Sequence, residues 1–261
     1  TDLFGAGIQL DDPGPTSGSL KRGSQLDGSP INNGENIAVI PYDLQISPTV
    51  APLEIIPNTG TVKNYASIEG GPNFANGLKD DTDVTIQGPE LAKSLLGTSI
   101  VDAYNSNTEA VIGEIARYKL DVAIPRGTTP DAIVVDSLPA GLAFKQLLGA
   151  PVVDSGISYT GSLNPVVSNN GRTVTFDLGD VTNTNASNAL KGFSVEYEAV
   201  VLNVSTNNAG TTLQNTASLD WSTPHTALPP VQATAITVIE PTITVNKKVS
   251  PSTAQAGDKA T

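Results

Sequence analysis

Apolar and polar side chains alternate with a period of two along much of the chain, a pattern typical of β-strands that bury one face. The clearest example covers residues 114–124, where Ile, Tyr, Leu and Val alternate with polar or small neighbours. Later segments have the same strand character: residues 132–136, 173–176, 193–202, 211–221 and 232–239. Short helical patterns are confined to residues 89–96 and 185–191. Because Gly, Pro and Asn separate the strands, the pattern predicts an all-β, immunoglobulin-like β-sandwich with Greek-key connections.

A repeat emerges when the sequence is compared with itself. Landmarks recur in the same order at nearly constant spacing: Tyr42 with Tyr197, Asn64 with Asn215, and Pro89 with Pro241. The spacings are 197 − 42 = 155, 215 − 64 = 151 and 241 − 89 = 152 residues. The repeat predicts that residues 1–88 are the C-terminal part of a preceding β-sandwich repeat with long loops. Residues 89–240 would then form one complete repeat, and residues 241–261 would supply the first strand of the next.

The composition narrows the class of protein. Only 15% of the residues are charged, against about 25% in a typical soluble domain. The net charge of −12 argues against nucleic acid and anionic lipid as partners, since both need clustered Lys and Arg. The chain has neither Cys nor Met, the residues most readily oxidised, which suits an exposed extracellular or cell-surface protein without disulfides. No apolar run approaches the roughly 18 residues of a membrane span.

Four motifs make the sequence recognisable. They are Pro-x-Leu-x-Lys at residues 89–93, Ile-Gly-Glu-Ile-Ala-Arg-Tyr at 112–118, Val-Val-Asp-Ser-Leu-Pro-Ala-Gly-Leu at 134–142, and Gln-Asn-Thr-Ala-Ser at 214–218. In this order they resemble the bacterial conserved-repeat surface domain and the closely related isopeptide-forming domain of fimbrial proteins. The resemblance implies an immunoglobulin-like sandwich, strung in tandem along a large cell-surface, adhesive or fimbrial protein.

The resemblance also implies a candidate site. In isopeptide-forming members a first-strand Lys condenses with an Asn near the last strand, helped by a carboxyl group, and the matching positions here are Lys93, Asn215 and Asp136. The reaction requires burial, because only a neutral amine can attack. The residues alone leave plainer roles open: an exposed strand Lys, a solvent-facing Asn and a turn-capping Asp.

Other chemistry is sparse. The acidic run Asp80, Asp81 and Asp83 could coordinate calcium, the only cofactor that the sequence suggests, although a solvated acidic loop is the favoured explanation. His225 is the only histidine and lies in a predicted loop. Without Cys the chain cannot build a structural zinc site of the usual kind. No nucleotide-binding or nucleophile motif is present in its required context, so we expect no enzymatic activity.

These observations favour a structural or adhesive module of a bacterial cell-surface or secreted repeat protein: a stalk, fimbrial or matrix component. Its partners would be neighbouring repeats or identical subunits, joined by strand pairing. An alternative is a filament subunit assembled by donor-strand exchange through the C-terminal strand at residues 242–249. A further alternative is an adhesin that binds a host or matrix ligand through the long loops at residues 1–36 and 69–82.

Overall fold

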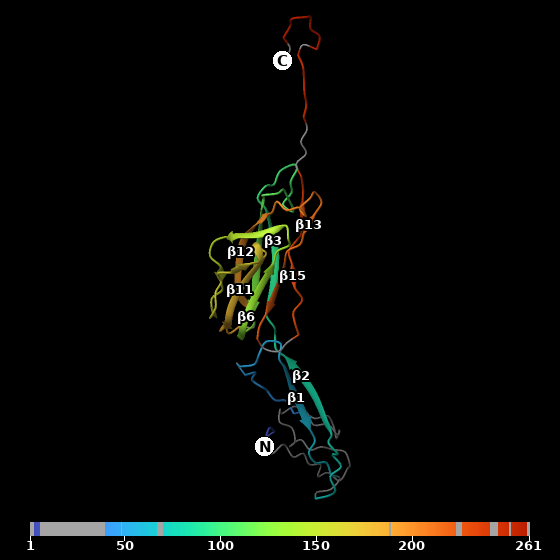
Figure 1. Cartoon of the computed structure of the whole chain (residues 1–261). Coiled ribbons are helices and arrows are strands. Elements are labelled where there is room, and N and C mark those ends of the chain that lie inside the picture. Colours follow the sequence, from blue (N-terminus) through green and yellow to red (C-terminus); the bar gives the residue numbers. More distant parts are fainter. Residues whose placement is uncertain are drawn as a thin grey trace. The chain divides into compact units, whose positions relative to one another are not determined.

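The computed structural model describes residues 3–5, 40–47, 49–66, 70–187, 189–222, 226–240, 245–250 and 252–259. The chain divides into two units, Thr1–Ser47 and Pro48–Thr261, and all the strands described below belong to the second (Figure 1). His225 and most of the predicted loop at residues 1–36 lie outside the described residues. The part of the chain that the structure describes contains no helix long and apolar enough to cross a membrane.

Two antiparallel sheets form the sandwich (Figure 1). The first has the order β3 (Glu90–Thr98), β5 (Ile115–Ile124), β12 (Lys191–Val201) and β7 (Leu142–Leu147), with β8 (Val152–Val153) also paired to β12. The second has the order β10 (Val166–Ser168), β11 (Thr173–Asn183), β6 (Gly127–Ser137), β14 (Thr216–Asp220) and β15 (Val231–Gln232), with β9 (Ile157–Tyr159) also paired to β11. A three-residue 3-10 turn, η2 (Asn169–Gly171), precedes β11.

Two smaller pairings complete the described strands. A three-stranded sheet contains β13 (Thr212–Leu213), β16 (Ile236–Val238) and β4 (Glu109–Ala110), and a separate antiparallel ribbon contains β1 (Ile55–Thr61) and β2 (Lys79–Thr85). The chain passes repeatedly from one large sheet to the other, since β5 precedes β6, β6 precedes β7, and β11 precedes β12. This confirms the predicted all-β, immunoglobulin-like sandwich.

The core lies between the two large sheets, and the period-two pattern creates it. Along β5 every second side chain is buried, including Tyr118, Leu120 and Ile124. Along β6 and β11 the same alternation turns Val134 and Phe176 inward, and both are almost fully buried. Side chains from both sheets belong to one apolar cluster, which is the main source of folding free energy in such a sandwich.

The predicted helical segments are wrong. Residues 90–98 form β3, where Leu91 and Leu95 are half-buried and Lys93 between them is buried. Ala, Leu and Lys are good helix formers. Pairing along β5 nevertheless outweighs this local preference, because it satisfies the backbone hydrogen bonds of β3 and covers its apolar side chains. In the second segment no helix forms among the described residues, and Lys191 already begins β12.

Other strand boundaries also differ. The single strand expected at residues 211–221 is interrupted at Gln214 and Asn215, which separate β13 from β14, and the one expected at 232–239 divides into β15 and β16. Residues 79–82 of the expected loop lie in β2. The division into repeats at residues 88 and 240 stays a prediction.

Candidate functional site

The first residue of the site is a lysine at an inward position of a strand, where lysine is uncommon. Lys93 lies on β3 opposite Leu120 of β5, and its side chain is fully buried. A lone buried ammonium group is costly, because burial removes its hydration, so a buried Lys normally has a partner. Here the partner comes from the facing sheet.

That partner is Asp136 on β6. Ala132 and Val134 occupy the two preceding inward positions of the strand, and Asp136 follows them as the third, also fully buried. Asp136 lies in the middle of the sheet, since β6 pairs with β11 on one side and with β14 on the other. The hydrogen-bond partners of Asp136 among the described residues are the side chains of Lys93 and Tyr197 rather than a turn amide, so the turn-capping role is excluded.

Asn215 and Tyr197 complete the cluster. Asn215 immediately precedes β14 and is fully buried. Tyr197 points inward from β12, the central strand of the first sheet, and is also fully buried. The four residues therefore come from both sheets: Lys93 and Tyr197 from the first, Asp136 and Asn215 from the second.

The polar contacts centre on Tyr197. Lys93 Nζ forms a salt bridge with Asp136 Oδ2 and donates to the Tyr197 hydroxyl oxygen at 2.9 Å. The Tyr197 hydroxyl donates to Asp136 Oδ2 at 2.6 Å, and Asn215 Nδ2 donates to the Tyr197 oxygen at 2.8 Å. Within the described residues, Asp136 Oδ1 and Asn215 Oδ1 are buried without a hydrogen-bond partner. Unpaired buried acceptors are costly, which makes this an unusual arrangement for a purely structural network.

Burial shifts the pKa values of both members of the pair. Loss of hydration lowers the pKa of Lys93, and the nearby Asp136 only partly opposes this effect. Loss of hydration likewise raises the pKa of Asp136, against the opposing influence of Lys93. Both shifts favour the neutral amine and the protonated carboxyl group over the ion pair. A neutral amine is the form that can act as a nucleophile.

Aromatic rings enclose the amine. The rings of Tyr118 and Tyr197 stack with centroids 5.6 Å apart, and Phe144 lies 5.7 Å from Tyr197. Lys93 Nζ is 5.1 Å from the centroid of Tyr118 and 5.3 Å from that of Tyr197. Such walls leave the amine with few polar neighbours besides those of the cluster, and low polarity strengthens the remaining electrostatic interactions.

The structure thus brings together Lys93, Asp136 and Asn215, the three residues that the sequence singled out. Their burial excludes an exposed strand Lys and a solvent-facing Asn. Tyr197 was missed, because an inward Tyr in an alternating strand is adequately explained by packing. The repeat did point to this residue, because Tyr197 aligns with Tyr42 as the first landmark of the repeat.

The predicted calcium ligands lie elsewhere. Asp80, Asp81 and Asp83 belong to β2 and are exposed, and successive strand residues point to opposite faces, so Asp80 is turned away from the other two. Among the residues that the structure describes, no group of three acidic or His side chains could hold a metal ion. Calcium binding stays a prediction, and the described residues offer no set of ligands for it.

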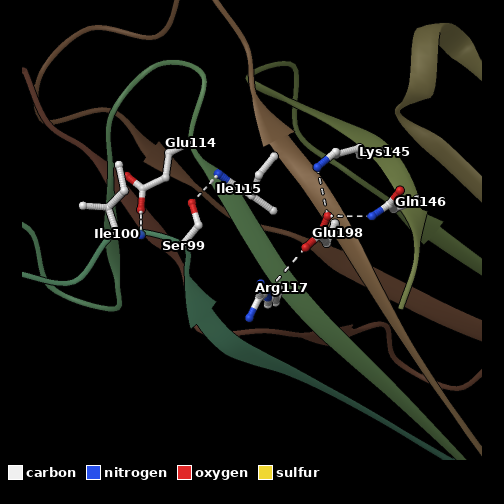
Figure 2. Close-up of polar contacts among 8 residues, drawn as sticks. All are labelled: Ser99, Ile100, Glu114, Ile115, Arg117, Lys145, Gln146 and Glu198. Carbon is white, nitrogen blue, oxygen red and sulfur yellow. Dashed lines mark hydrogen bonds and ion pairs between the residues drawn. The ribbon is translucent and has the colours of Figure 1, made fainter. Parts of the chain in front are cut away.

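Two further carboxylates have structural roles (Figure 2). Glu114, from the second motif, accepts hydrogen bonds from Ile100 N and Asn105 Nδ2, both at 2.8 Å, and fixes the segment ahead of β5. Glu198 follows Tyr197 and therefore points away from the core. Lys145 and Gln146 each donate to Glu198 at 3.0 Å, and these partners, Lys145 above all, lower its pKa.

The fold and the cluster together define an all-β sandwich with a buried amine, carboxyl and amide that all hydrogen-bond to the Tyr197 hydroxyl. No family model matches the sequence, and no curated protein matches it. Solved structures with similar folds include one titled BspA_C_WT, with 16% identity, a TM-score of 0.40, and coverage of 64% of this chain and 56% of that one. The C-terminal domain of the antigen I/II-family protein AspA from Streptococcus pyogenes has 13% identity, a TM-score of 0.39, and coverage of 64% and 52%.

The major pilin SpaD from Corynebacterium diphtheriae has 14% identity, a TM-score of 0.35, and coverage of 57% of this chain and 34% of that one. The matched regions span between about a third and somewhat more than half of these three solved chains. Similarity at this level does not establish the family of the chain or its role.

Proposed function

We propose that this chain is a structural module of a bacterial cell-surface or secreted protein, and that it cross-links itself through an amide bond between Lys93 and Asn215. The observation that carries the proposal is the fully buried cluster in which a lysine, a carboxyl group and an asparagine from facing sheets meet. A surface protein without disulfides needs another source of resistance to force and heat, and such a bond would supply it.

The reaction follows from the protonation states that burial favours. The neutral Nζ of Lys93 attacks Cγ of Asn215, the new Nζ–Cγ bond forms, and Nδ2 departs with its bonding electrons as ammonia. Protonated Asp136 polarises the amide by donating to its oxygen. That hydrogen bond would use Asp136 Oδ1 and Asn215 Oδ1, the two buried atoms without partners in the described structure.

The bond would join the two sheets. Lys93 lies on β3 in the first sheet, while Asn215 lies next to β14 in the second. Tension applied through the two ends of the chain would bypass the residues between the linked positions, because a covalent bond outlasts the hydrogen bonds and packing around it. A module of this kind transmits force without unfolding fully, as a stalk or fimbrial component requires.

Single-molecule stretching tests this role. The roughly 120 residues between the linked positions would add about 430 Å of contour length if they were free to extend. We expect the native protein to lack this extension and the Asn215→Ala variant to show it. Asn215→Ala is chosen because it leaves the Lys93–Asp136 contact in place. Equal extension of the two proteins would contradict the proposed role.

A second candidate function is assembly with identical chains. The described residues 245–250 pair with no strand, and the apolar side chains Val245 and Val249 are 88% and 58% exposed. Lys247 and Lys248 lie between them, and the exposed acidic residues of β2 have the opposite charge. A segment of this pattern could add to a sheet edge of a second copy. Ligand binding through the long loops remains a prediction.

Sedimentation at increasing protein concentration tests the second candidate. We expect larger species to appear with concentration, and the double substitution Val245→Asp and Val249→Asp to remove them, because a carboxylate cannot enter an apolar position of a sheet. A native protein that stays monomeric at all concentrations would exclude assembly through this segment.

A further inference from the structure

The Tyr197 hydroxyl touches both nitrogen atoms of the proposed cross-linking reaction. It lies 2.9 Å from Lys93 Nζ and 2.8 Å from Asn215 Nδ2. It also donates to Asp136 Oδ2 at 2.6 Å, which fixes the position of the oxygen between the two nitrogens. One nitrogen must lose a proton during the reaction and the other must gain one.

We propose that Tyr197 is a catalytic residue that carries this proton from Lys93 to the departing nitrogen of Asn215. The inference rests on the proposed cross-link. After Nζ attacks Cγ, the Tyr197 hydroxyl gives its proton to Nδ2 and takes one from Nζ. The Cγ–Nδ2 bond then breaks, ammonia leaves, and the hydroxyl is restored. One N–H bond is lost at Nζ and one is gained at Nδ2, so no other reactant is needed.

The need for such a carrier is chemical. An amide nitrogen is a very poor leaving group unless it is protonated as the bond to carbon breaks. In the proposed reaction Asp136 acts at the amide oxygen, whereas the observed hydrogen bond of Asn215 Nδ2 goes to Tyr197. The amide oxygen and the amide nitrogen of Asn215 would thus each have a separate proton donor, Asp136 for the oxygen and Tyr197 for the nitrogen.

The surroundings keep Tyr197 suited to this role. Burial, with a further contribution from Asp136, raises the pKa of Tyr197, so the phenol remains protonated and able to donate. The ring is held between Tyr118 and Phe144, which limits its movement. A preorganised donor accelerates proton transfer because little reorganisation is needed at the moment of reaction.

Tyr118 provides a matched control. It is a second fully buried Tyr, its ring stacks on that of Tyr197, and its hydroxyl has no hydrogen-bond partner among the described residues. Tyr118→Phe therefore removes a buried hydroxyl from the same aromatic wall without touching the contacts of Asn215. Tyr197→Phe removes the hydroxyl that contacts both nitrogens.

The test is a time course of intact mass, followed from expression through incubation of the purified, folded protein. We expect the native protein and Tyr118→Phe to have lost ammonia by harvest, and Tyr197→Phe to lose it at least about 100-fold more slowly. Circular dichroism and the fluorescence of Trp221 verify folding. Completion of the reaction in folded Tyr197→Phe as fast as in Tyr118→Phe would overturn the role of Tyr197.

A second variant separates packing from proton transfer. 4-Fluorophenylalanine at position 197 keeps a polar atom near the place of the hydroxyl oxygen but carries no transferable proton. We expect it to fold and to react as slowly as Tyr197→Phe, and reaction at the native rate would refute the proposal. A native protein of full, unchanged mass would instead refute the cross-link itself, so the two failures are distinguishable.

Discussion

Substitution of Asp136 by alanine is expected to cause the largest loss of stability in this protein. Two effects combine. The cross-link cannot form, which removes about 5 kcal/mol that closure of a loop of roughly 120 residues contributes. In addition, Lys93 is left in the core without its carboxyl partner, which costs about 3–5 kcal/mol in comparable buried pairs. Denaturant unfolding, followed by the fluorescence of Trp221, measures the difference from the native protein.

The pH dependence of this variant identifies the cause. Burial lowers the pKa of Lys93 even when Asp136 is present. Removal of the Asp136 carboxyl takes away the interactions that oppose this shift, so the pKa falls further. Between this lowered pKa and the ordinary value of 10.5, the unfolded chain binds a proton that the folded chain does not. Stability of Asp136→Ala must therefore rise as the pH rises through this window. A pH-independent loss would contradict the account of a stranded buried amine.

Substitution of Lys93 by methionine is expected to have the second largest effect. Methionine fills a similar volume without a charge, and the remaining Asp136 becomes neutral readily because burial raises its pKa. At a pH below the ordinary pKa of Asp136, the variant should therefore lose only the cross-link, about 5 kcal/mol, and melt roughly 10–20 °C below the native protein. Differential scanning calorimetry measures both quantities.

The matched control is Lys145→Met. Lys145 also pairs with a carboxylate, Glu198, but its side chain is 45% exposed, so the pair contributes less than about 1 kcal/mol. The stability of Lys93→Met should also change with pH in the opposite direction to that of Asp136→Ala. In Lys93→Met the folded pKa of Asp136 lies above its ordinary 3.8, so stability is complete below that value and falls as the pH rises through the raised pKa. Equal melting temperatures of the Lys93 and Lys145 variants would count against the cross-link.

The apolar pattern was sufficient to predict β5, β12 and parts of β6, β11 and β14, because a buried sheet face imposes its period directly on the sequence. Asp136 follows the same alternation, since it occupies the next inward position after Ala132 and Val134. Its burial was readable from the pattern, whereas the identity of its partner came from the family resemblance.

Lys93 and Tyr197 show why the rest could not be predicted. The local sequence around Lys93 favours a helix, and only pairing with a strand more than twenty residues later in the chain makes it a strand. The role of the Tyr197 hydroxyl depends on the distance between the two sheets, which is set by the whole core and is not encoded near Tyr197. The break that places Asn215 just ahead of β14 depends in the same way on pairing with distant strands.

The central claim is that Lys93 and Asn215 become covalently joined, and the intact mass of the purified chain tests it most directly. Formation of the bond releases one ammonia, so the account predicts a mass about 17 Da below that calculated from the sequence. The Asn215→Ala variant should show its full calculated mass. Proteolysis of the native protein should also yield a branched peptide that contains both residues. A native chain of full calculated mass, folded and with Lys93 still reactive after unfolding, would contradict the account.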